Sequence, residues 1–468
     1  MKLHNTLTRQ TEEFNPQSND NVRMYSCGPT VYDHIHIGNL SAYVYVDTLR
    51  RTLQASGLNV RHIMNFTDVD DKTIKRSLEN YPDLAPEEAL KKLTTNYADI
   101  FLNDIADIGN DVFSTEFVYA TNSIEGIRQL ITELFEDDFA YITDDGVYFS
   151  IEKYRASGKK YGQLLTLTEE NTSSARIAND EYDKDYVHDF ALWKVKKAGE
   201  PAWQFDLDGH DLTGRPGWHV ECSVMSVQSL GQPFDIHTGG VDNIFPHHEN
   251  EIAQSTAGKG NLYAKYFVHN EHLLVDGKKM SKSLNNFYRL QDIKEKGYDP
   301  LAFRLMVLQS HYRSQSNFTW ENLDAAQTRL QGWRTVADLR WQVVDNDSEI
   351  SFDNVSAAVT EYIEVDLNTP MAFATISTEF MDELNELGYL PNNSKKSFID
   401  FLTKLDTLLG LGLLDSNDIN PQQKNIIVER QKARDAKDWA KSDELRDQLK
   451  EQGVEVRDTD HGPIWSRI

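Results

Sequence analysis

Cysteine is nearly absent from this sequence, in which Cys27 and Cys222 are the only two among 468 residues. Two cysteines cannot form the disulfide framework of a secreted protein, so the count predicts a reducing compartment, the cytoplasm. Long apolar runs are also missing, because no stretch approaches the roughly 20 residues that a membrane-spanning helix needs. The N-terminal stretch MKLHNTLTRQTEEF has no apolar segment of the signal-peptide kind. We therefore expect a cytoplasmic protein without membrane contact.

Positive charge is the second shortage, because 48 Lys and Arg face 74 Asp and Glu, for a net charge of -26. This balance argues against indiscriminate binding to nucleic acid. The excess is uneven: Glu79–Asp145 holds 3 basic and 16 acidic residues, whereas Asp276–Arg340 holds 11 and 7. A polyanion would be met along the C-terminal half, although mixed charges on solvated helices explain the pattern more simply.

What the sequence does have is the size and composition of a globular protein. Hydrophobic residues make up 39% and charged residues 26% of the chain, which is typical of soluble domains. At 468 residues the chain predicts two to four domains with a large buried core.

The stretch around HIGN (residues 36–39) predicts a strand, a turn and a helix. Val22–Ser26 is a short apolar run, the CGPT turn that starts at Cys27 breaks it, and HIGN opens a helix to about Ser56. A helix N-terminus after such a turn offers N–H groups and a positive dipole end to a phosphate. Gly38 would let a nucleotide lie close to the backbone. An ordinary strand-to-helix turn is the alternative, and the nearby cysteine favours a functional site.

A second strand over Val60–Phe66 completes a β-α-β unit and ends in TDVDDK, which puts polar residues where open α/β sheets place ligands. Helical spacing follows over Glu87–Leu102 and Ser123–Glu136. Tyr141–Ile151 predicts a hairpin with an Asp-Gly turn. The polar segment Ser157–Glu200 resembles an insertion, within which the apolar residues 189–194 are expected to pack back onto the protein.

Candidate metal ligands and ribose contacts lie further along the chain. Phe234–Thr238 predicts a strand followed by GGVD, whose glycines and acid suit a nucleotide. PHHENE then opens a helix on which His247 and Glu251 share one face, although most H-x3-E pairs are only solvated or capping. With the two cysteines they offer a tetrahedral set that suits zinc. His248 is the rival of His247, because its spacing is also helical.

A strand over Lys265–His269 precedes the loop that contains KMSKS, residues 279–283. Two lysines three apart, Lys279 and Lys282, can hold nucleotide phosphates as point charges, and the serines can add hydrogen bonds. A basic surface loop would explain a lysine pair alone. It does not explain KMSKS after HIGN in an α/β chain.

These motifs resemble those of the cysteinyl-tRNA synthetases, a family of class I aminoacyl-tRNA synthetases. HIGN stands where that class has HIGH, and KMSKS matches letter for letter. The match runs from about residue 22 to the end with a gap in the polar insertion. Its further elements are CGPTVYDHIHIGN, NFTDVDDK, GRPGWHVECS, FPHHENE, HYRS, DLNTPMAFA and ARDAKDWAKSDELRDQL.

The resemblance implies an α/β fold with a Rossmann-type parallel-sheet catalytic domain split by an insertion. A stem-contact fold, an α-helical bundle and a small anticodon-binding domain would follow. We expect the first half of the catalytic domain over 1–120, the connective insertion over 121–215, the second half over 216–275, the KMSKS stem-contact fold over 276–316, the bundle over 317–414 and the anticodon-binding domain over 415–468.

The implied function is that of a cysteine–tRNA ligase. It would use ATP to convert L-cysteine to cysteinyl-adenylate and then charge the 3'-terminal adenosine of tRNA(Cys). One zinc ion per chain would select the cysteine thiolate, so no editing domain is needed. The expected partners are tRNA(Cys), L-cysteine and ATP with Mg²⁺, and the expected state is a monomer. The zinc ligands implied by the family are Cys27, Cys222, His247 and Glu251.

Residue roles carry over from the motifs as well. Positioning and charge neutralisation should dominate the chemistry, since a carboxylate is already a nucleophile. The catalytic residues implied are His36, Asn39, Lys279 and Lys282. These four together with Gly38, Gly240 and Asp242 would bind ATP, and Thr67 and Trp218 would contact the cysteine substrate.

Three departures from the family pattern stand out. Asn39 replaces the second histidine of HIGH and can still donate a hydrogen bond, although it cannot be charged. Thr238 stands where the family usually has glycine, which would tighten the nucleotide site. Trp203–Thr213 differs from the usual short link, and its role is open.

Three alternatives share parts of this pattern. A ligase that passes the same adenylate to a small amine would not need Glu321–Ile468. A non-catalytic RNA-binding relative would be expected to lose lysines or metal ligands, and this chain keeps them. A purely structural zinc module would leave KMSKS without a purpose.

Overall fold

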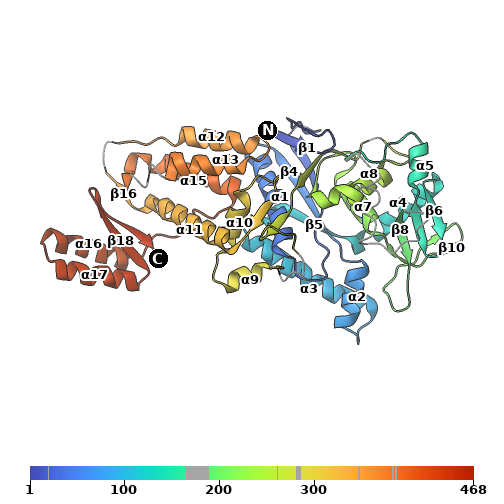
Figure 1. The fold of residues 1–468 in the computed structure, drawn as a ribbon, viewed down its shortest axis with the longest axis horizontal. Helices are drawn as coiled ribbons and strands as arrows, with labels where there is room; N and C mark the ends of the chain where they lie inside the picture. The colour runs from blue at the N-terminus through green and yellow to red at the C-terminus, as the bar shows by residue number, and fades with distance from the viewer. Residues whose placement is uncertain are drawn as a thin grey trace. The chain divides into compact units, whose positions relative to one another are not determined.

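The computed structural model describes residues 1–18, 20–164, 189–260, 262–280, 286–345, 348–381, 384 and 387–468. The chain divides into two compact units (Figure 1). One consists of Met1–Glu295 with Tyr312–Phe318, and the other of Lys296–His311 with Thr319–Ile468. Among the described helices, none combines the length and apolarity that a membrane crossing requires.

The first unit is built on a five-stranded parallel sheet in the order β13-β12-β3-β4-β5. The chain winds outward from β3 through β4 to β5 and then returns to place β12 on the other side of β3. The β3/β12 pair is therefore the switch point at which open α/β sheets bind ligands. The sheet confirms the four predicted strands, whose bounds are β3 Asn21–Ser26, β4 Asn59–Phe66, β12 Phe234–Gly240 and β13 Ala264–Asn270. The fifth strand, β5 Thr115–Tyr119, was not predicted.

The structure confirms the predicted helices at HIGN, over 87–102, over 123–136 and at PHHENE, and it adds helices that were not predicted. The HIGN helix is α1, Ile37–Ala55, with His36 as its N-cap, and it is buried on nearly every side. Helix α2 begins with a reciprocal capping box between Asp70 and Thr73. The remaining bounds are α2 Asp71–Asn80, α3 Pro86–Asp107, η1 Val112–Ser114, η2 Ala120–Ser123, α7 Trp218–Leu230, η4 Val241–Asn243, η5 Ile244–His248, α8 Glu249–Thr256 and α9 Leu290–Glu295.

The inserted segment forms its own antiparallel sheet in the order β11-β8-β7-β6. The apolar run that was expected to pack back onto the protein is the inner strand β8, with Trp193 fully buried. Residues 165–188 of the polar segment lie outside the described residues. The bounds are α4 Ile124–Glu136, β6 Ala140–Thr143, β7 Gly146–Phe149, α5 Ile151–Ala156, β8 Phe190–Val195, β9 Asp206–Leu207, β10 His210–Asp211 and β11 Gly214–Pro216.

Two details of the insert go beyond the sequence prediction. The predicted position of the hairpin turn was wrong by one residue. Thr143 pairs with Gly146, so Asp144 and Asp145 form the turn and Gly146 begins the second strand. The segment Trp203–Thr213 contains the hairpin β9–β10, and its Leu212 carbonyl accepts a hydrogen bond of 2.7 Å from Nε1 of Trp193. This segment therefore covers the buried tryptophan of the insert.

Short strand pairs complete the first unit. Strands β1 (Lys2–Asn5) and β2 (Gln10–Glu13) pair near the N-terminus. Strand β14 (Leu273–Val275), which precedes the KMSKS loop in the sequence, forms a parallel pair with β15 (Ser316–Phe318). Both pairs belong to the same unit as the parallel sheet.

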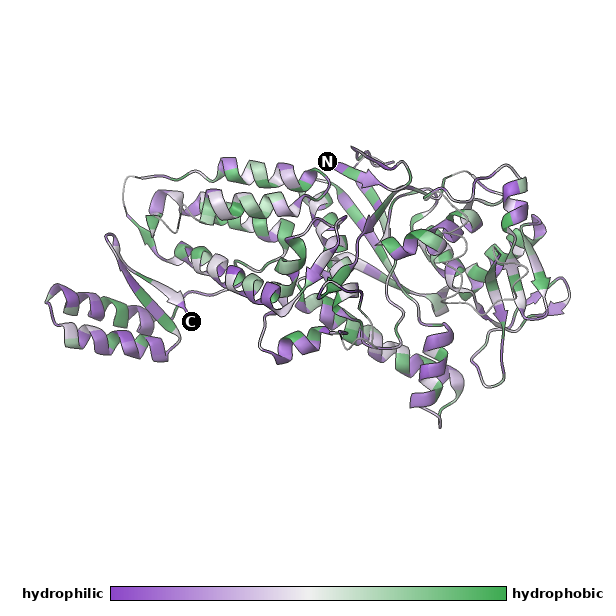
Figure 2. Cartoon of the chain, in the orientation of Figure 1, coloured by the Kyte–Doolittle hydropathy of each residue, from purple (hydrophilic) through white to green (hydrophobic). Residues whose placement is uncertain are grey.

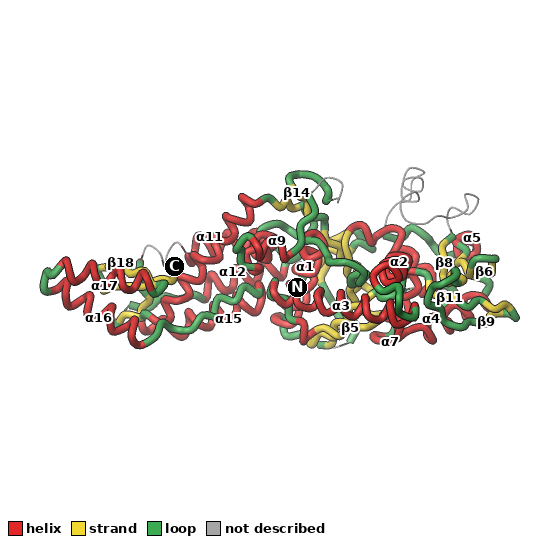
Figure 3. Tube along the Cα trace, turned by 90° about the horizontal axis from the view of Figure 1, so that it is seen from below, coloured by secondary structure: helices red, strands yellow, loops and turns green. Residues whose placement is uncertain are grey.

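The second unit is largely helical, as Figure 3 shows in red. Its bundle has a core of Phe352, Phe380, Phe398 and Phe401, whose rings contact one another. The bounds are α10 Pro300–Leu308, α11 Trp320–Ala337, η7 Asp338–Trp341, β16 Val343–Val344, α12 Asp353–Glu364, α13 Thr369–Ile376, η8 Ser377–Met381, β17 Leu390–Pro391, η9 Asn392–Ser394 and α15 Lys395–Leu409.

The chain ends in a small α/β domain of two helices and a hairpin. Figure 2 shows that α16 and α17 are largely hydrophilic, and a separate small core lies between them and the hairpin. That core contains Ile419, Ile427, Leu449, Val454, Val456 and Trp465. The bounds are α16 Pro421–Asp435, α17 Trp439–Glu451, β18 Val454–Thr459 and β19 Gly462–Arg467.

Candidate active site

The candidate site begins where β3 and β12 end. Cys27 follows β3, and its backbone N–H donates to the carbonyl of Thr238 in β12 at 3.1 Å. Gly28 is required at the next position, because a Cβ there would lie 1.8 Å from the carbonyl oxygen of Asn65. The Asn65 side chain in turn accepts a hydrogen bond from the Gly28 N–H at 2.9 Å. These contacts fix the Cys27 backbone at the switch point of the sheet.

The structure brings the four expected metal ligands together. Donor atoms of Cys27, Cys222, His247 and Glu251 all lie within 4.8 Å of one another. Cys27 is half-buried and the other three are buried. A second set, in which His237 and His248 replace Cys222 and His247, meets the same distance limit. The two sets share Cys27 and Glu251, so one ion at a time could use them.

The two carboxylate oxygens of Glu251 differ in their partners. Oε2 accepts hydrogen bonds from Nε2 of His237 and from the hydroxyl of Tyr263, both at 2.8 Å. Oε1 is buried without a hydrogen bond among the described residues, and Nε2 of His247 lies 3.0 Å from it. A buried carboxylate oxygen with an unmet acceptor capacity suits a cation.

His248 is engaged at both of its ring nitrogens. Nε2 lies 3.3 Å from Sγ of Cys27, and Nδ1 lies 2.8 Å from Nε2 of His269. The ring of His269 continues the chain of contacts to the hydroxyl of Thr6 at 2.8 Å. His247, in contrast, contacts His219 through Nδ1 at 2.9 Å and directs Nε2 toward Glu251. The second ring nitrogen of a metal-bound histidine commonly contacts such a partner.

Burial sets the charges of these groups. It lowers the pKa of His247 to about 3 and also lowers the pKa of His248, beside His237 and His269. Both rings are therefore neutral at pH 7, and a neutral imidazole has a lone pair for a metal ion. Partial burial and the neighbouring Cys222 thiol raise the pKa of Cys27. A divalent cation would reverse this effect, because it favours the thiolate.

The donor chemistry fits zinc. Two sulfur atoms, one imidazole nitrogen and one carboxylate oxygen are ligands that zinc accepts in tetrahedral sites. Mg²⁺ prefers oxygen ligands in octahedral geometry, which this pair of thiols does not offer. The set Cys27, Cys222, His247 and Glu251 is thus a candidate zinc site.

His36 caps the helix that follows the site. Its Nδ1 accepts a hydrogen bond of 3.2 Å from the N–H of Asn39, and the N–H of Ile37 donates to the carbonyl of Tyr288 at 2.9 Å. Part of the expected phosphate-binding capacity of the helix N-terminus is therefore already in use. Burial lowers the pKa of His36 to about 4, although Asp242 opposes the shift. His36 is neutral at pH 7, and Asn39 is exposed.

The start of KMSKS lies against HIGN. A Cβ on Gly38 would meet the terminal methyl of Met280 at 2.3 Å. Lys279 is exposed and its carbonyl accepts a hydrogen bond from Asn286 at 3.2 Å. Lys282 lies outside the described residues.

The expected ribose and cysteine contacts lie around the same strand ends. The N–H of Gly240 donates to Oδ1 of Asn243 at 3.1 Å, and Asp242 is exposed beside it. Thr67 is buried, and its hydroxyl accepts from Asn65 at 3.2 Å. Trp218 is 41% exposed and stacks on the ring of His247 at 4.2 Å between centroids. Its indole therefore lies at the open side of the candidate zinc site.

Thr238 belongs to a buried polar network that crosses the sheet. Its hydroxyl donates to Oγ of Ser26 at 2.7 Å, and Ser26 contacts Nε2 of His62 at 2.8 Å. Nδ1 of His62 contacts Thr115 at 2.9 Å. The hydroxyl of Thr238, the residue that departs from the family pattern, thus has its hydrogen-bond partner in β3 and is not directed at a nucleotide.

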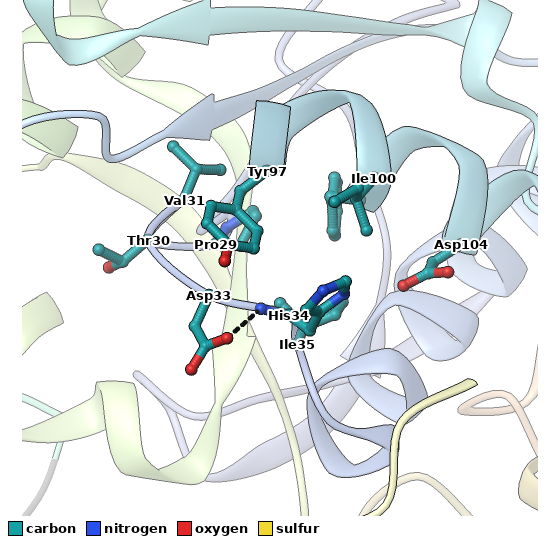
Figure 4. A pocket seen from close by; sticks show the side chains of 10 residues that line it. Pro29, Thr30, Val31, Asp33, His34, Ile35, Tyr97, Ile100 and Asp104 are labelled. Atoms are coloured by element: carbon teal, nitrogen blue, oxygen red, sulfur yellow. Dashed lines mark hydrogen bonds between the residues drawn. The ribbon is translucent and has the colours of Figure 1, made fainter. Parts of the chain in front are cut away.

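A shallow pocket lies between the segment before HIGN and helix α3. Figure 4 shows Tyr97, Ile100 and Asp104 of α3 on one side and His34 on the other, while the carboxylate of Asp33 points away from α3 and accepts from the N–H of His34. The residues that line it include none of the candidate site residues. It adjoins the site without containing the donor set.

The sequence interpretation missed two residues of the histidine cluster. His237 lies in the middle of β12, and His269 lies near the end of β13, in adjacent parallel strands. The available signal was a histidine within each of two predicted strands. Their apolar flanks made both strands read as ordinary core.

Comparisons with known proteins agree along the whole chain. Residues 13–328 match the model of the class I (C) tRNA synthetase catalytic domain, and residues 416–465 match the cysteinyl-tRNA ligase anticodon binding domain. A cysteine–tRNA ligase of Chlamydia caviae is 40% identical over 100% of this chain and 98% of its own. One of Brachyspira hyodysenteriae is 38% identical over 99% of each.

Solved structures show the same fold at low identity. A LeuRS–tRNA complex of Agrobacterium radiobacter has a TM-score of 0.60 at 12% identity and covers 86% of this chain and 85% of its own. A methionyl-tRNA synthetase of Mycobacterium tuberculosis has a TM-score of 0.57 at 13% identity, covering 86% and 95%. These likenesses confirm the class I fold that the motifs implied.

Proposed function

This chain belongs to the cysteine–tRNA ligase family of class I tRNA synthetases, and we propose that it selects its substrate at a zinc ion held by Cys27, Cys222, His247 and Glu251. Its activity is that of a cysteine–tRNA ligase, an aminoacyl-tRNA synthetase that couples cysteine to tRNA with ATP. The zinc set and the residue roles below are the proposed part.

Zinc is proposed at the set with two thiols because Cys222 adds a second soft ligand. When bound, zinc supplies a soft Lewis acid that favours the thiolate of cysteine over the hydroxyl of serine. The unpaired Oε1 of Glu251 and its 3.0 Å distance to Nε2 of His247 support this set. Tyr263 and His237 hold the other carboxylate oxygen and so orient Glu251. We propose one zinc ion per chain.

The protein's own residues would orient the cysteine for attack. Trp218, stacked on His247, would cover the substrate side chain and exclude water, and the buried Thr67 would contact the substrate from β4. The cysteine carboxylate attacks the α-phosphate of ATP, its oxygen–phosphorus bond forms, and the bond to pyrophosphate breaks. A ribose hydroxyl of the tRNA terminus then attacks the carbonyl carbon of cysteinyl-adenylate, the bond from this carbon to the phosphate oxygen breaks, and AMP leaves together with the hydroxyl proton.

Residues of HIGN and KMSKS would bind the phosphates of ATP and stabilise their negative charge. Neutral His36 would donate a hydrogen bond to a phosphate oxygen, and the exposed amide of Asn39 would add another. Lys279 and Lys282 would neutralise the transition-state phosphates, with Mg²⁺ accompanying ATP. Gly240 and Asp242 would contact the ribose, and Gly38 would admit the nucleotide. These roles are proposed from the motifs, and Gly240 and Asp242 also lie at the end of β12.

The partners follow from the family as a tRNA, an amino acid and ATP. We propose tRNA(Cys) and L-cysteine in particular, a monomeric enzyme, and the cytoplasm as its location. The domain division proposed is that of the sequence analysis, with the anticodon-binding domain over 415–468.

The observation that carries the proposal is the convergence of four donor atoms within 4.8 Å beside the HIGN and KMSKS motifs. The test is charging of total tRNA with labelled cysteine, ATP and Mg²⁺, with serine as a control. We expect cysteine-specific charging. Cysteine-dependent exchange of pyrophosphate into ATP without charging would indicate a small-amine acceptor, and silence in both assays from a zinc-loaded protein would overturn the enzymatic activity.

Two lysine variants sharpen the test. Lys279→Ala should lower the exchange rate by about 100- to 1000-fold, the usual cost of a lost electrostatic contact to the transition state. Lys278→Ala removes an equally exposed neighbour and should leave the rate within about twofold, because only the KMSKS lysines contact phosphate in this proposal. Equal losses in both variants would indicate a general effect of loop charge.

A further inference from the structure

The second unit contains a buried polar joint between the helical bundle and the C-terminal domain. Asp338 directly follows α11 and is 2% exposed. Its Oδ1 accepts from the hydroxyl of Ser416 at 2.5 Å and from Arg340 at 3.3 Å. Its Oδ2 accepts from Nε of Arg467, in the last strand of the chain, at 3.0 Å. One carboxylate thus connects the end of α11, the linker between α15 and α16 (residues 410–420) and β19.

A second contact lies four residues further along. Nε2 of Gln342 donates to the carbonyl of Trp465 at 3.0 Å, and its Oε1 accepts from the Trp465 N–H at 2.6 Å. The side chain of Gln342 therefore pairs with the backbone of β19 as a neighbouring strand would. Arg467 also donates to the carbonyl of Asn417 in the linker.

These contacts join two parts that have separate cores. The C-terminal core lies among α16, α17 and the hairpin, whereas the bundle core is formed by its own aromatic residues. The joint between them consists of the hydrogen bonds of Gln342 and of the contacts of the buried, charged Asp338. Such groups stabilise little in net terms, because their desolvation offsets much of the attraction. They do select one relative orientation, since a shift would leave the carboxylate of Asp338 buried and unpaired.

We infer that Asp338, Arg467 and Gln342 are positioning residues that hold the C-terminal domain in the orientation in which it meets tRNA. This inference rests on the proposed function, because it needs a tRNA that contacts both the catalytic unit and this domain. A rigid connection between two binding parts raises the effective concentration of the second and lowers the entropy lost on binding. Adenylate formation needs no tRNA and should be independent of the joint.

Three variants test the joint: Arg467→Lys, Arg467→Gln and Gln342→Ala. Arg467→Lys keeps the positive charge but loses the planar guanidinium group, which donates to Asp338 and to Asn417 at the same time. Gln342→Ala removes two hydrogen bonds without any change of charge. We expect each variant to raise the KM for tRNA about tenfold, with kcat for charging within about twofold. Cysteine-dependent pyrophosphate exchange should equal that of the wild type.

The outcomes separate this inference from the proposed function. A wild-type protein that does not charge tRNA contradicts both, whereas normal charging by the wild type and all three variants overturns only the joint. Impaired Arg467→Gln with normal Arg467→Lys and Gln342→Ala would mean that the arginine acts by its charge on RNA. Loss of pyrophosphate exchange in the variants would show an effect beyond orientation and would also overturn the inference.

Discussion

The terminal methyl of Met280 packs against the backbone of Gly38, so closely that a Cβ on Gly38 would lie 2.3 Å from it. The same Cβ would lie 2.9 Å from Nδ1 of His36. The HIGN and KMSKS motifs, more than 200 residues apart in the sequence, therefore meet at the one position of HIGN that has no side chain. A nucleotide that lies over Gly38 has to displace the methionine.

Gly38→Ala should lower cysteine-dependent exchange of pyrophosphate into ATP about 100-fold, chiefly through a higher KM for ATP. The added methyl would stand where the nucleotide approaches the backbone, and a displacement of about 1 Å at a reacting centre can cost this factor. Steady-state exchange rates at several ATP concentrations measure the effect.

The double variant Gly38→Ala with Met280→Ala identifies the cause of that loss. If the new methyl only collided with Met280, shortening the methionine would restore the rate. We expect no restoration, because the nucleotide itself needs the space. Recovery to the level of Met280→Ala alone would contradict the assignment of Gly38 to ATP.

His247→Ala should remove the metal and His248→Ala should retain it. In the proposed set the Nε2 of His247 is a ligand, whereas His248 contacts Cys27 from outside and is oriented by His269. Loss of an outer contact typically weakens metal binding by about 10- to 100-fold and does not abolish it. Zinc content by elemental mass spectrometry, after dialysis against a chelator, gives the answer.

Cys222→Ser provides the matched control for the metal test. Cys222 belongs to the first donor set and is absent from the second, so its variant should also lose zinc. Retained zinc in Cys222→Ser and His247→Ala, together with loss in His248→Ala, would assign the ion to the set with His237.

The sequence predicted four of the five strands of the sheet, because these are short, largely apolar runs that end in glycine or polar residues, and it missed β5. Val22–Ser26 and Phe234–Thr238 are such runs, and the structure places them side by side. It also indicated the four residues of the candidate donor set, which the structure brings together, since cysteine is rare enough to be informative. The role of Thr238 was not predictable, because its partner Ser26 is 212 residues away. The sequence interpretation also missed His237 and His269, because their contacts with His248 depend on tertiary packing and not on local spacing.

Thr238→Val should lower the free energy of unfolding by about 1–3 kcal/mol, because it leaves the buried Ser26 hydroxyl without its donor. Thr238→Ser keeps that hydroxyl and should cost less. The urea midpoints of the two variants measure the difference. Wild-type stability in Thr238→Val, together with a loss in Thr238→Ser, would mean that packing of the threonine methyl matters and that the hydrogen bond to Ser26 does not.

His62 should make the stability of the first unit depend on pH. Burial lowers its pKa to about 3, whereas in the unfolded chain the value is about 6.5. Between these values the unfolded chain binds a proton that the folded chain does not. Stability is therefore complete above pH 6.5 and falls as the pH falls, by about 1.4 kcal/mol per pH unit from this residue.

His62→Gln removes that proton while leaving an amide that can contact Ser26 or Thr115. At pH 7.5 the variant should be less stable than the wild type by about 1–2 kcal/mol, because one of the two buried contacts is lost. From pH 6.5 to 5 the wild type alone loses about 2 kcal/mol through His62, so the two urea midpoints should converge near pH 5.5. The other buried histidines affect both proteins equally and cancel in the comparison. A constant difference across this range would show that His62 titrates normally in the folded chain, and the network through Ser26 would then have to accommodate a charged ring.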